Sequence, residues 1–207
     1  MELSTFIYFL TASILLTLAP GPDILYLLTK SLADGAKSGV VLAAGLVSGI
    51  VFHTFLVMIG VAALVQSSPV AFTALKIFGA AYLIFLAFKS FTAARAGKKI
   101  SMQKSDARIS FGKLYRRGVL MNVLNPKVLL FFLAFLPQFV NFSASPSLQI
   151  IFLGVTFALQ AFIIFSAVAI CAGKVRNLIL LKKNLGQLFN YVEAAVLGII
   201  ALTLLVL

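Results

Sequence analysis

The sequence predicts an all-α membrane protein with six transmembrane helices, and three observations support that fold class. Of the 207 residues, 62% are hydrophobic and only 11% are charged, whereas water-soluble domains average about 45–50% and about 25%. A soluble domain of this size has too small an interior to bury that much apolar surface. The apolar residues also gather in six runs, each long enough to cross about 30 Å of hydrocarbon as a helix.

The six runs define the predicted helices in chain order. They cover residues 3–28, 39–65, 69–91, 118–142, 148–173 and 188–207. All are too long for the strands of a membrane barrel, which have about ten residues. The first run lacks a preceding basic residue and is too long for a cleaved signal peptide, so we expect it to remain as a helix. We therefore predict a single transmembrane domain over 1–207, with three-helix halves 1–91 and 118–207 and a basic loop, 92–117.

The basic residues predict how these helices are oriented. Fourteen Lys and Arg residues lie in the links 29–38, 92–117 and 174–187, and none lies in the other two links or at the termini. Since positive loops stay on the cytoplasmic side, we expect these three loops inside and both the N- and the C-terminus outside. The net charge of +12 therefore indicates contacts with membrane lipids, anionic ones at the cytoplasmic loops, and no nucleic-acid partner.

Two of the six runs contain residues that interrupt a helix. The first run carries Pro20, Gly21 and Pro22, and the fourth carries Pro126. Each proline lacks a backbone donor and clashes with the preceding turn, so we expect both helices to be broken. Backbone groups freed at that depth are tolerated only where they face protein or water. A kink that only shapes packing is the alternative.

Charged residues inside the runs mark a candidate site. Asp23 and Lys127 follow the two breaks, and Glu193 lies in the sixth run. A charge there costs at least about 2.5–3.5 kcal/mol, so we expect all three to face the interior of the bundle. Asp23 and Lys127 form the natural pair, which leaves Glu193 over. Pairing with a purely structural role is the alternative for all three.

Neutral polar residues beside these charges complete the candidate site. Asn122 and Asn125 precede Pro126 in the fourth run, and His53 lies near the middle of the second run. For His53 we favour a hydrogen-bonded packing role over a proton relay. The candidate substrate or coupling residues are Asp23, Asn122, Asn125, Lys127, Glu193 and His53.

The two halves are predicted to form a 3+3 inverted repeat. Residues 76–83 and 190–197 match in part without gaps, and a duplicated unit of three helices must insert upside down. Inverted repeats with discontinuous helices near their interface are typical of many transporters. The offsets of the two breaks differ, since Asp23 lies further from the start of its run than Lys127 does.

The residue composition also excludes several classes of protein. A single cysteine, Cys171, excludes an internal disulfide, a thiol–disulfide relay and a cysteine-built zinc site. We expect no bound metal, no cofactor and no enzymatic activity, because no nucleophile–base pair or ligand cluster can be assembled. Small residues at Gly45 and Gly49, with Gly60 further on, suit either contact within the chain or a homodimer.

Four motifs, in order along nearly the whole chain, carry a family resemblance. They are LAPGPD at 18–23, GAAYL at 79–83, the segment from Gly118 through NVLNPK, and FLPQF at 135–139. With these motifs the chain resembles the LysE/RhtB family of bacterial amino-acid exporters. The resemblance implies a bacterial inner-membrane protein that exports amino acids, or close derivatives, from the cytoplasm by secondary active transport and proton antiport. It also implies functional roles for Asp23 and Lys127, whereas Glu193 stands where a small residue is expected.

The chemistry of an amino acid fits these residues. A zwitterion carries a carboxylate and an ammonium group, so a dry site for it needs both charges. A helix that restarts after a proline presents free N–H groups to a carboxylate. We expect Lys127 to anchor the carboxylate and Asp23 to be the coupling acid, with Asp23 or Glu193 accepting the ammonium. An exporter of a metal cation or another small solute on the same scaffold is the alternative, and the transported amino acid stays open.

Overall fold

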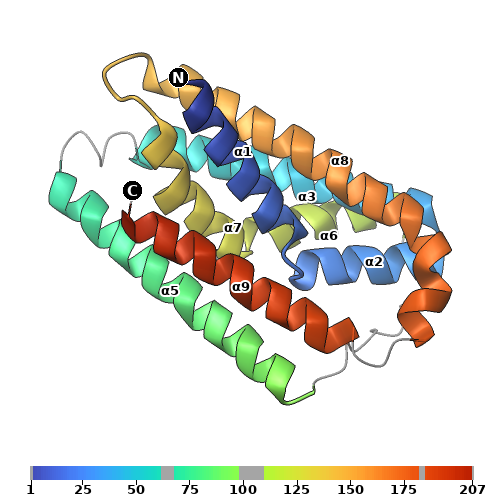
Figure 1. Ribbon diagram of the computed structural model, residues 1–207. Helices are drawn as coiled ribbons and strands as arrows, with labels where there is room; N and C mark the ends of the chain where they lie inside the picture. Colours follow the sequence, from blue (N-terminus) through green and yellow to red (C-terminus); the bar gives the residue numbers. More distant parts are fainter. Residues whose placement is uncertain (1, 62–67, 98–109, 182–184, 207) are drawn as a thin grey trace.

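The computed structural model describes residues 2–61, 68–97, 110–181 and 185–206, and every regular element in these ranges is helical. Four of the helices are long and apolar enough to cross a membrane, and six spans result if each of two bent helix pairs counts as one. The helices form one bundle, with both chain termini at the same end (Figure 1). The predicted all-α fold with six apolar segments is confirmed at this level.

Both predicted breaks are present. α1 (Leu3–Leu18) and α2 (Pro22–Asp34) are bent by 56° relative to each other. The second break separates α6 (Phe111–Val123) from α7 (Pro126–Leu130), with a bend of 50°. A π turn, η2 (Phe131–Phe135), and a 3₁₀ turn, η3 (Leu136–Phe139), follow α7. In both cases a proline begins the second helix, where the N–H that it lacks would have no helical partner.

In the described ranges, four unbroken helices pack with the two broken segments. They are α3 (Ala36–Leu56), which ends in the π turn η1 (Val57–Val61), α5 (Pro69–Arg95), α8 (Pro146–Leu181) and α9 (Leu185–Val206). α5 packs along α9, and α3 packs against α6 and α8 (Figure 1). α1 contacts both α8 and α9, and η2 contacts both α3 and α5. The broken segments therefore connect the two groups of helices.

The helices extend beyond the apolar runs, so parts of the predicted cytoplasmic links 29–38, 92–117 and 174–187 are helical. Only Gly35, whose φ of 88° suits glycine, separates α2 from α3. α6 begins at Phe111 rather than at 118, and α8 continues to Leu181. The length of an apolar run reflects the thickness of the hydrocarbon layer. A helix can continue past that layer into water, because Lys, Arg, Leu and Ala all have high helix propensity. Residues 98–109 and 182–184 lie outside the described ranges.

Phenylalanine side chains fill the core around the second broken segment. Phe131 and Phe135 of η2 stack with their ring centroids 4.8 Å apart. Phe9 of α1 lies against Phe131 and Phe139, at 6.0 and 5.5 Å. Phe157 of α8 lies 5.4 Å from Phe131, and all these rings are buried. They join α1, α8 and the segment that follows the second break.

Glycines allow α3 and α6 to approach closely. A Cβ built on Gly118 of α6 would lie 2.6 Å from the backbone oxygen of Leu42 and 3.0 Å from the Cα of Gly45. Gly49 of α3 also faces α6, whereas nothing lies within 4 Å of a Cβ on Gly60. The face of Gly45 and Gly49 is therefore used for contact within the chain.

Replacing Gly118 by Ala should lower the stability of the folded protein. The added methyl group meets the backbone of α3, and overpacking of this kind costs about 1–3 kcal/mol. Thermal unfolding of the detergent-purified protein, followed by circular dichroism, should show a lower melting temperature. Gly112→Ala on the same helix is the matched control, because nothing lies within 4 Å of a methyl group added there. Equal melting temperatures for the two variants would contradict the close contact.

Candidate functional site

Asp23 and Lys127 occupy corresponding positions beside the two breaks. Each lies in the first turn of the helix that follows a break, Asp23 in α2 and Lys127 in α7. Both side chains are buried, with 7% and 8% of their surface exposed. They line the same small cavity inside the bundle. The structure thus brings these two predicted site residues together, away from the outer surface of the bundle.

Asn125 connects the two charged residues. Its Nδ2 donates to Asp23 Oδ2 at 2.6 Å, and its Oδ1 accepts the backbone N–H of Lys127 at 3.0 Å as the N-cap of α7. The ammonium of Lys127 and the carboxylate of Asp23 stay more than 4.0 Å apart, so the direct ion pair expected from the sequence is not formed.

The ammonium of Lys127 instead caps the end of α1. Its Nζ donates to Ala19 O at 3.1 Å and to Leu16 O at 3.4 Å. In a continuous helix Leu16 O would accept from the residue four positions further on, which is Pro20 and has no N–H. Lys127 therefore supplies a donor that the proline removes. An ammonium group has three N–H donors, so one remains for another acceptor.

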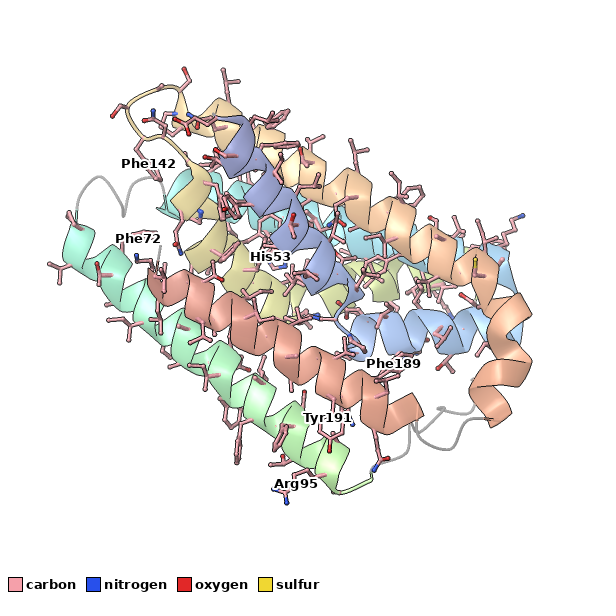
Figure 2. All side chains as sticks on the ribbon, viewed as in Figure 1. His53, Phe72, Arg95, Phe142, Phe189 and Tyr191 are labelled. Carbon is pink, nitrogen blue, oxygen red and sulfur yellow. The ribbon has the colours of Figure 1, made fainter. Side chains whose placement is uncertain are left out.

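His53 adds a second donor at the second break, where Asn122 O already accepts the backbone N–H of Asn125 at 3.0 Å. The carbonyl of Asn122 lies four positions before Pro126, and His53 Nε2 lies 3.1 Å from that oxygen. Because a carbonyl only accepts, Nε2 is the protonated nitrogen. The imidazole is fully buried beside Phe52 and Phe132, in the middle of the bundle (Figure 2). This geometry is that of a hydrogen-bonded packing residue.

The cavity beside Asp23 and Lys127 is small. Its volume is about 20 Å³, which is room for about one water molecule, whereas ligand pockets hold about 300–1,000 Å³. The lining residues are Leu16, Thr17, Ala19, Asp23, Ile24, Ile50, Asn122, Lys127, Val128, Phe157 and Phe165. The Oδ1 of Asn122 is buried without a hydrogen-bond partner. The cavity is therefore too small for an amino acid in this state, and the Oδ1 of Asn122 lies against Gly49 of α3.

Thr17 is a site residue that the sequence does not indicate. It lines the cavity, and its hydroxyl accepts a hydrogen bond from Nε2 of Gln160 at 2.9 Å and donates to Ser13 O at 2.8 Å. Threonine is common in membrane helices, so the residue type carries no signal. Only its position, within one turn before Pro20, could have indicated it.

Glu193 lies outside the cavity. It is half-buried on α9, and the hydroxyl of Ser90 on α5 donates to its Oε2 at 2.8 Å. Its carboxylate also attracts the ammonium of Lys127. The structure therefore places the third predicted charge near Lys127 but not in the wall of the closed site.

The site offers the groups that a small zwitterion needs. The carboxylate of Asp23 and the ammonium group of Lys127 line one small cavity. A metal site is not supported in the part of the chain that the structure describes, where no three His, Cys, Asp or Glu residues lie close enough to hold an ion.

Comparisons with known proteins cover the whole site. A sequence model of the family described as LysE type translocator matches residues 14–207. Leucine efflux proteins of Salmonella choleraesuis (strain SC-B67) and Salmonella typhimurium (strain LT2) are 30% identical to this chain over 183 residues, which is 88% of this chain and 85% of theirs. No solved structure matches the chain. The family match includes both breaks and every site residue described above.

Asn125→Ala should lower the free energy of unfolding by more than the loss of a helix cap alone would. The change removes the N-cap of α7, worth about 0.5–2 kcal/mol, and takes a donor from buried Asp23, which costs about 1–3 kcal/mol more. Ser68→Ala is the matched control, because Ser68 caps α5 through the N–H of Ala71 and holds no carboxylate in that contact. Thermal unfolding in detergent should show the larger decrease for Asn125→Ala. Equal decreases would mean that Asn125 does not hold Asp23.

Proposed function

Because the chain belongs to the LysE type translocator family, it is a transport protein and not an enzyme, and we propose that it exports amino acids from the cytoplasm by secondary active transport. The observation that carries this proposal is the enclosed pair of opposite charges at the two helix breaks. Asp23 and Lys127 are both buried and line one cavity. Charges kept inside a membrane protein at such cost mark the path of a solute.

An amino-acid zwitterion matches the groups around this cavity. The ammonium of Lys127 holds the carboxylate of the substrate, and Asp23 accepts the ammonium group of the substrate. Asn125 holds Asp23 in place through its side-chain amide. A metal cation fits less well, because the ammonium of Lys127 already binds the carbonyl oxygens at the first break.

The apolar part of the cavity favours an aliphatic substrate. Asp23 and Lys127 are the only charged residues among those that line it, and most of the others are apolar. Leucine efflux proteins are among the relatives of the chain. We therefore place a neutral, aliphatic amino acid such as leucine in this site.

Export requires the site to open and close. A cavity of about 20 Å³ cannot hold an amino acid, so the helices must separate at the breaks to admit one. In the proposed cycle Asp23 takes up a proton from outside and releases it to the cytoplasm as the amino acid moves outward. The protein is then a proton–amino-acid antiporter.

We place the protein in the bacterial inner membrane with both termini outside. Both termini lie at one end of the bundle (Figure 1), and Arg95 marks the other end of α5 (Figure 2). The links 29–38, 92–117 and 174–187 hold fourteen Lys and Arg residues, whereas the other links and the termini hold none, as expected if these three links are cytoplasmic. The proposed inverted repeat is supported by the two proline breaks and by the packing of α5 along α9, the third helix of each half.

Asp23→Asn should abolish export while the protein still folds and reaches the membrane. The amide keeps the size of the side chain but removes the charge that holds the ammonium group and the proton. Loss of one partner of a buried charge pair costs about 2–5 kcal/mol, so leucine efflux should fall at least about 30-fold. Efflux of labelled leucine from loaded cells measures this, with protein in the membrane quantified by immunoblot. Glu2→Gln, which changes an exposed carboxylate, is the control, and wild-type efflux by Asp23→Asn would remove Asp23 from the mechanism.

Amino-acid pools in cells fed with dipeptides should identify the substrate. Cells that express the protein should hold less leucine, or less of another aliphatic amino acid, than cells without it, while lysine and glutamate pools stay equal. Chromatography of cell extracts measures the pools, and a protonophore should remove the difference. Unchanged pools together with altered tolerance to metal salts would favour the metal exporter instead.

A further inference from the structure

Glu193 is the charged residue near the site that the proposed cycle does not use. Ser90 of α5 donates to its Oε2 at 2.8 Å. The other carboxylate oxygen, Oε1, faces the first break, where a Cβ built on Gly21 would lie 3.5 Å from it. One oxygen of Glu193 is thus held by α5, and the other is directed toward the turn between α1 and α2.

The ammonium of Lys127 also lies beside Gly21, on the side where a side chain would project. The Cβ position on Gly21 is 3.1 Å from Lys127 Nζ, and atoms of Lys127 and Glu193 are the nearest ones around it. Nζ and the carboxylate of Glu193 are more than 4.0 Å apart, so they form no ion pair in this state. Because glycine has no side chain, the space between them is open, and a small rotation of the flexible lysine would bring them into contact.

Lys127 therefore has two carboxylates within reach. Asp23 lines the closed cavity, whereas Glu193 does not, and both attract the ammonium. The present hydrogen bonds of Nζ go to Ala19 O and Leu16 O. The ammonium of Lys127 thus lies at the first break, between the cavity and Glu193 of α9.

We propose that Glu193 is a positioning residue for transport, which takes up the ammonium of Lys127 when the carboxylate of the substrate leaves. This inference rests on the proposed function, in which Lys127 binds that carboxylate. An ammonium group without a counter-charge in a dry site is high in free energy. If Lys127 had no other carboxylate to contact, it would therefore release the substrate carboxylate slowly. Glu193 provides the alternative partner and speeds release. Lys127 then returns to the carbonyl groups of the break.

A purely structural role for Glu193 predicts a different behaviour. In that role its carboxylate only ties α9 to α5 through Ser90, and glutamine could do the same, because its side-chain oxygen also accepts a hydrogen bond. Gln187 makes a comparable tie, since its Nε2 donates to Ala94 O of α5 at 3.3 Å. Charge at position 193 matters only if Glu193 acts on Lys127.

Leucine transport by reconstituted protein distinguishes the two roles. In proteoliposomes, Glu193→Gln should lower both the KM for labelled leucine and the maximal rate, each at least about fivefold, which is the lower end of couplings between two sites. Gln187→Ala should leave both values unchanged, and Glu193→Asp should recover most of the rate. Gly21→Ala is an independent variant, because φ at this position is −131° and alanine adopts that backbone. Its methyl group fills the space between the two charges and should change KM and rate in the same direction.

The possible failures are distinguishable. Wild-type KM and rate in both Glu193→Gln and Gly21→Ala would overturn the role of Glu193 and leave amino-acid export standing. A loss of rate shared equally by Gln187→Ala would also overturn it, in favour of the structural tie. Wild-type protein that moves neither leucine nor any other amino acid would overturn the proposed function, and the role of Glu193 with it.

Discussion

A proline inside a transmembrane helix leaves a carbonyl group without its donor at a depth where no water replaces it. Leu16 O and Asn122 O each precede a proline by four residues, and each receives a hydrogen bond from another segment, from Lys127 and His53 respectively. The second half of the chain supplies the donor for the first break, whereas at the second break the N–H of Asn125 already donates to Asn122 O and His53 adds a further donor. The two halves of the chain are therefore joined by hydrogen bonds at both breaks.

In the proposed site, the substrate carboxylate and the carbonyl groups at the end of α1 compete for the ammonium of Lys127. The group assigned to the substrate carboxylate, the ammonium of Lys127, is also the cap of α1. A hydrogen bond to a charged group contributes about 1.5–3 kcal/mol, so a substrate that draws Lys127 away weakens the end of α1 by a comparable amount. Binding and movement at the break are then linked through one side chain, and no separate gate is required.

The sequence was enough to predict the apolar segments and the helix breaks, because these follow from hydropathy and from the chemistry of proline. It was not enough to predict contacts that depend on the directions of side chains. The apolar runs and both breaks follow from composition, and the burial of Asp23 and Lys127 follows from the cost of charge in hydrocarbon. The bridge through Asn125 was not predictable, because charges alone favour a direct pair and only the structure shows that Lys127 turns toward α1. The helix ends extend past the predicted bounds because hydropathy does not measure helix propensity. The partner of His53 required knowing that α3 and α6 touch.

The tight closure of the cavity has a consequence for the energy supply of the cell. A continuous file of hydrogen-bonded water across about 30 Å of hydrocarbon conducts protons, and a space of about 20 Å³ holds about one molecule of such a file. The phenylalanine rings packed after the second break add an apolar barrier on that side. The cavity at the breaks thus holds too little water in this state to form such a file.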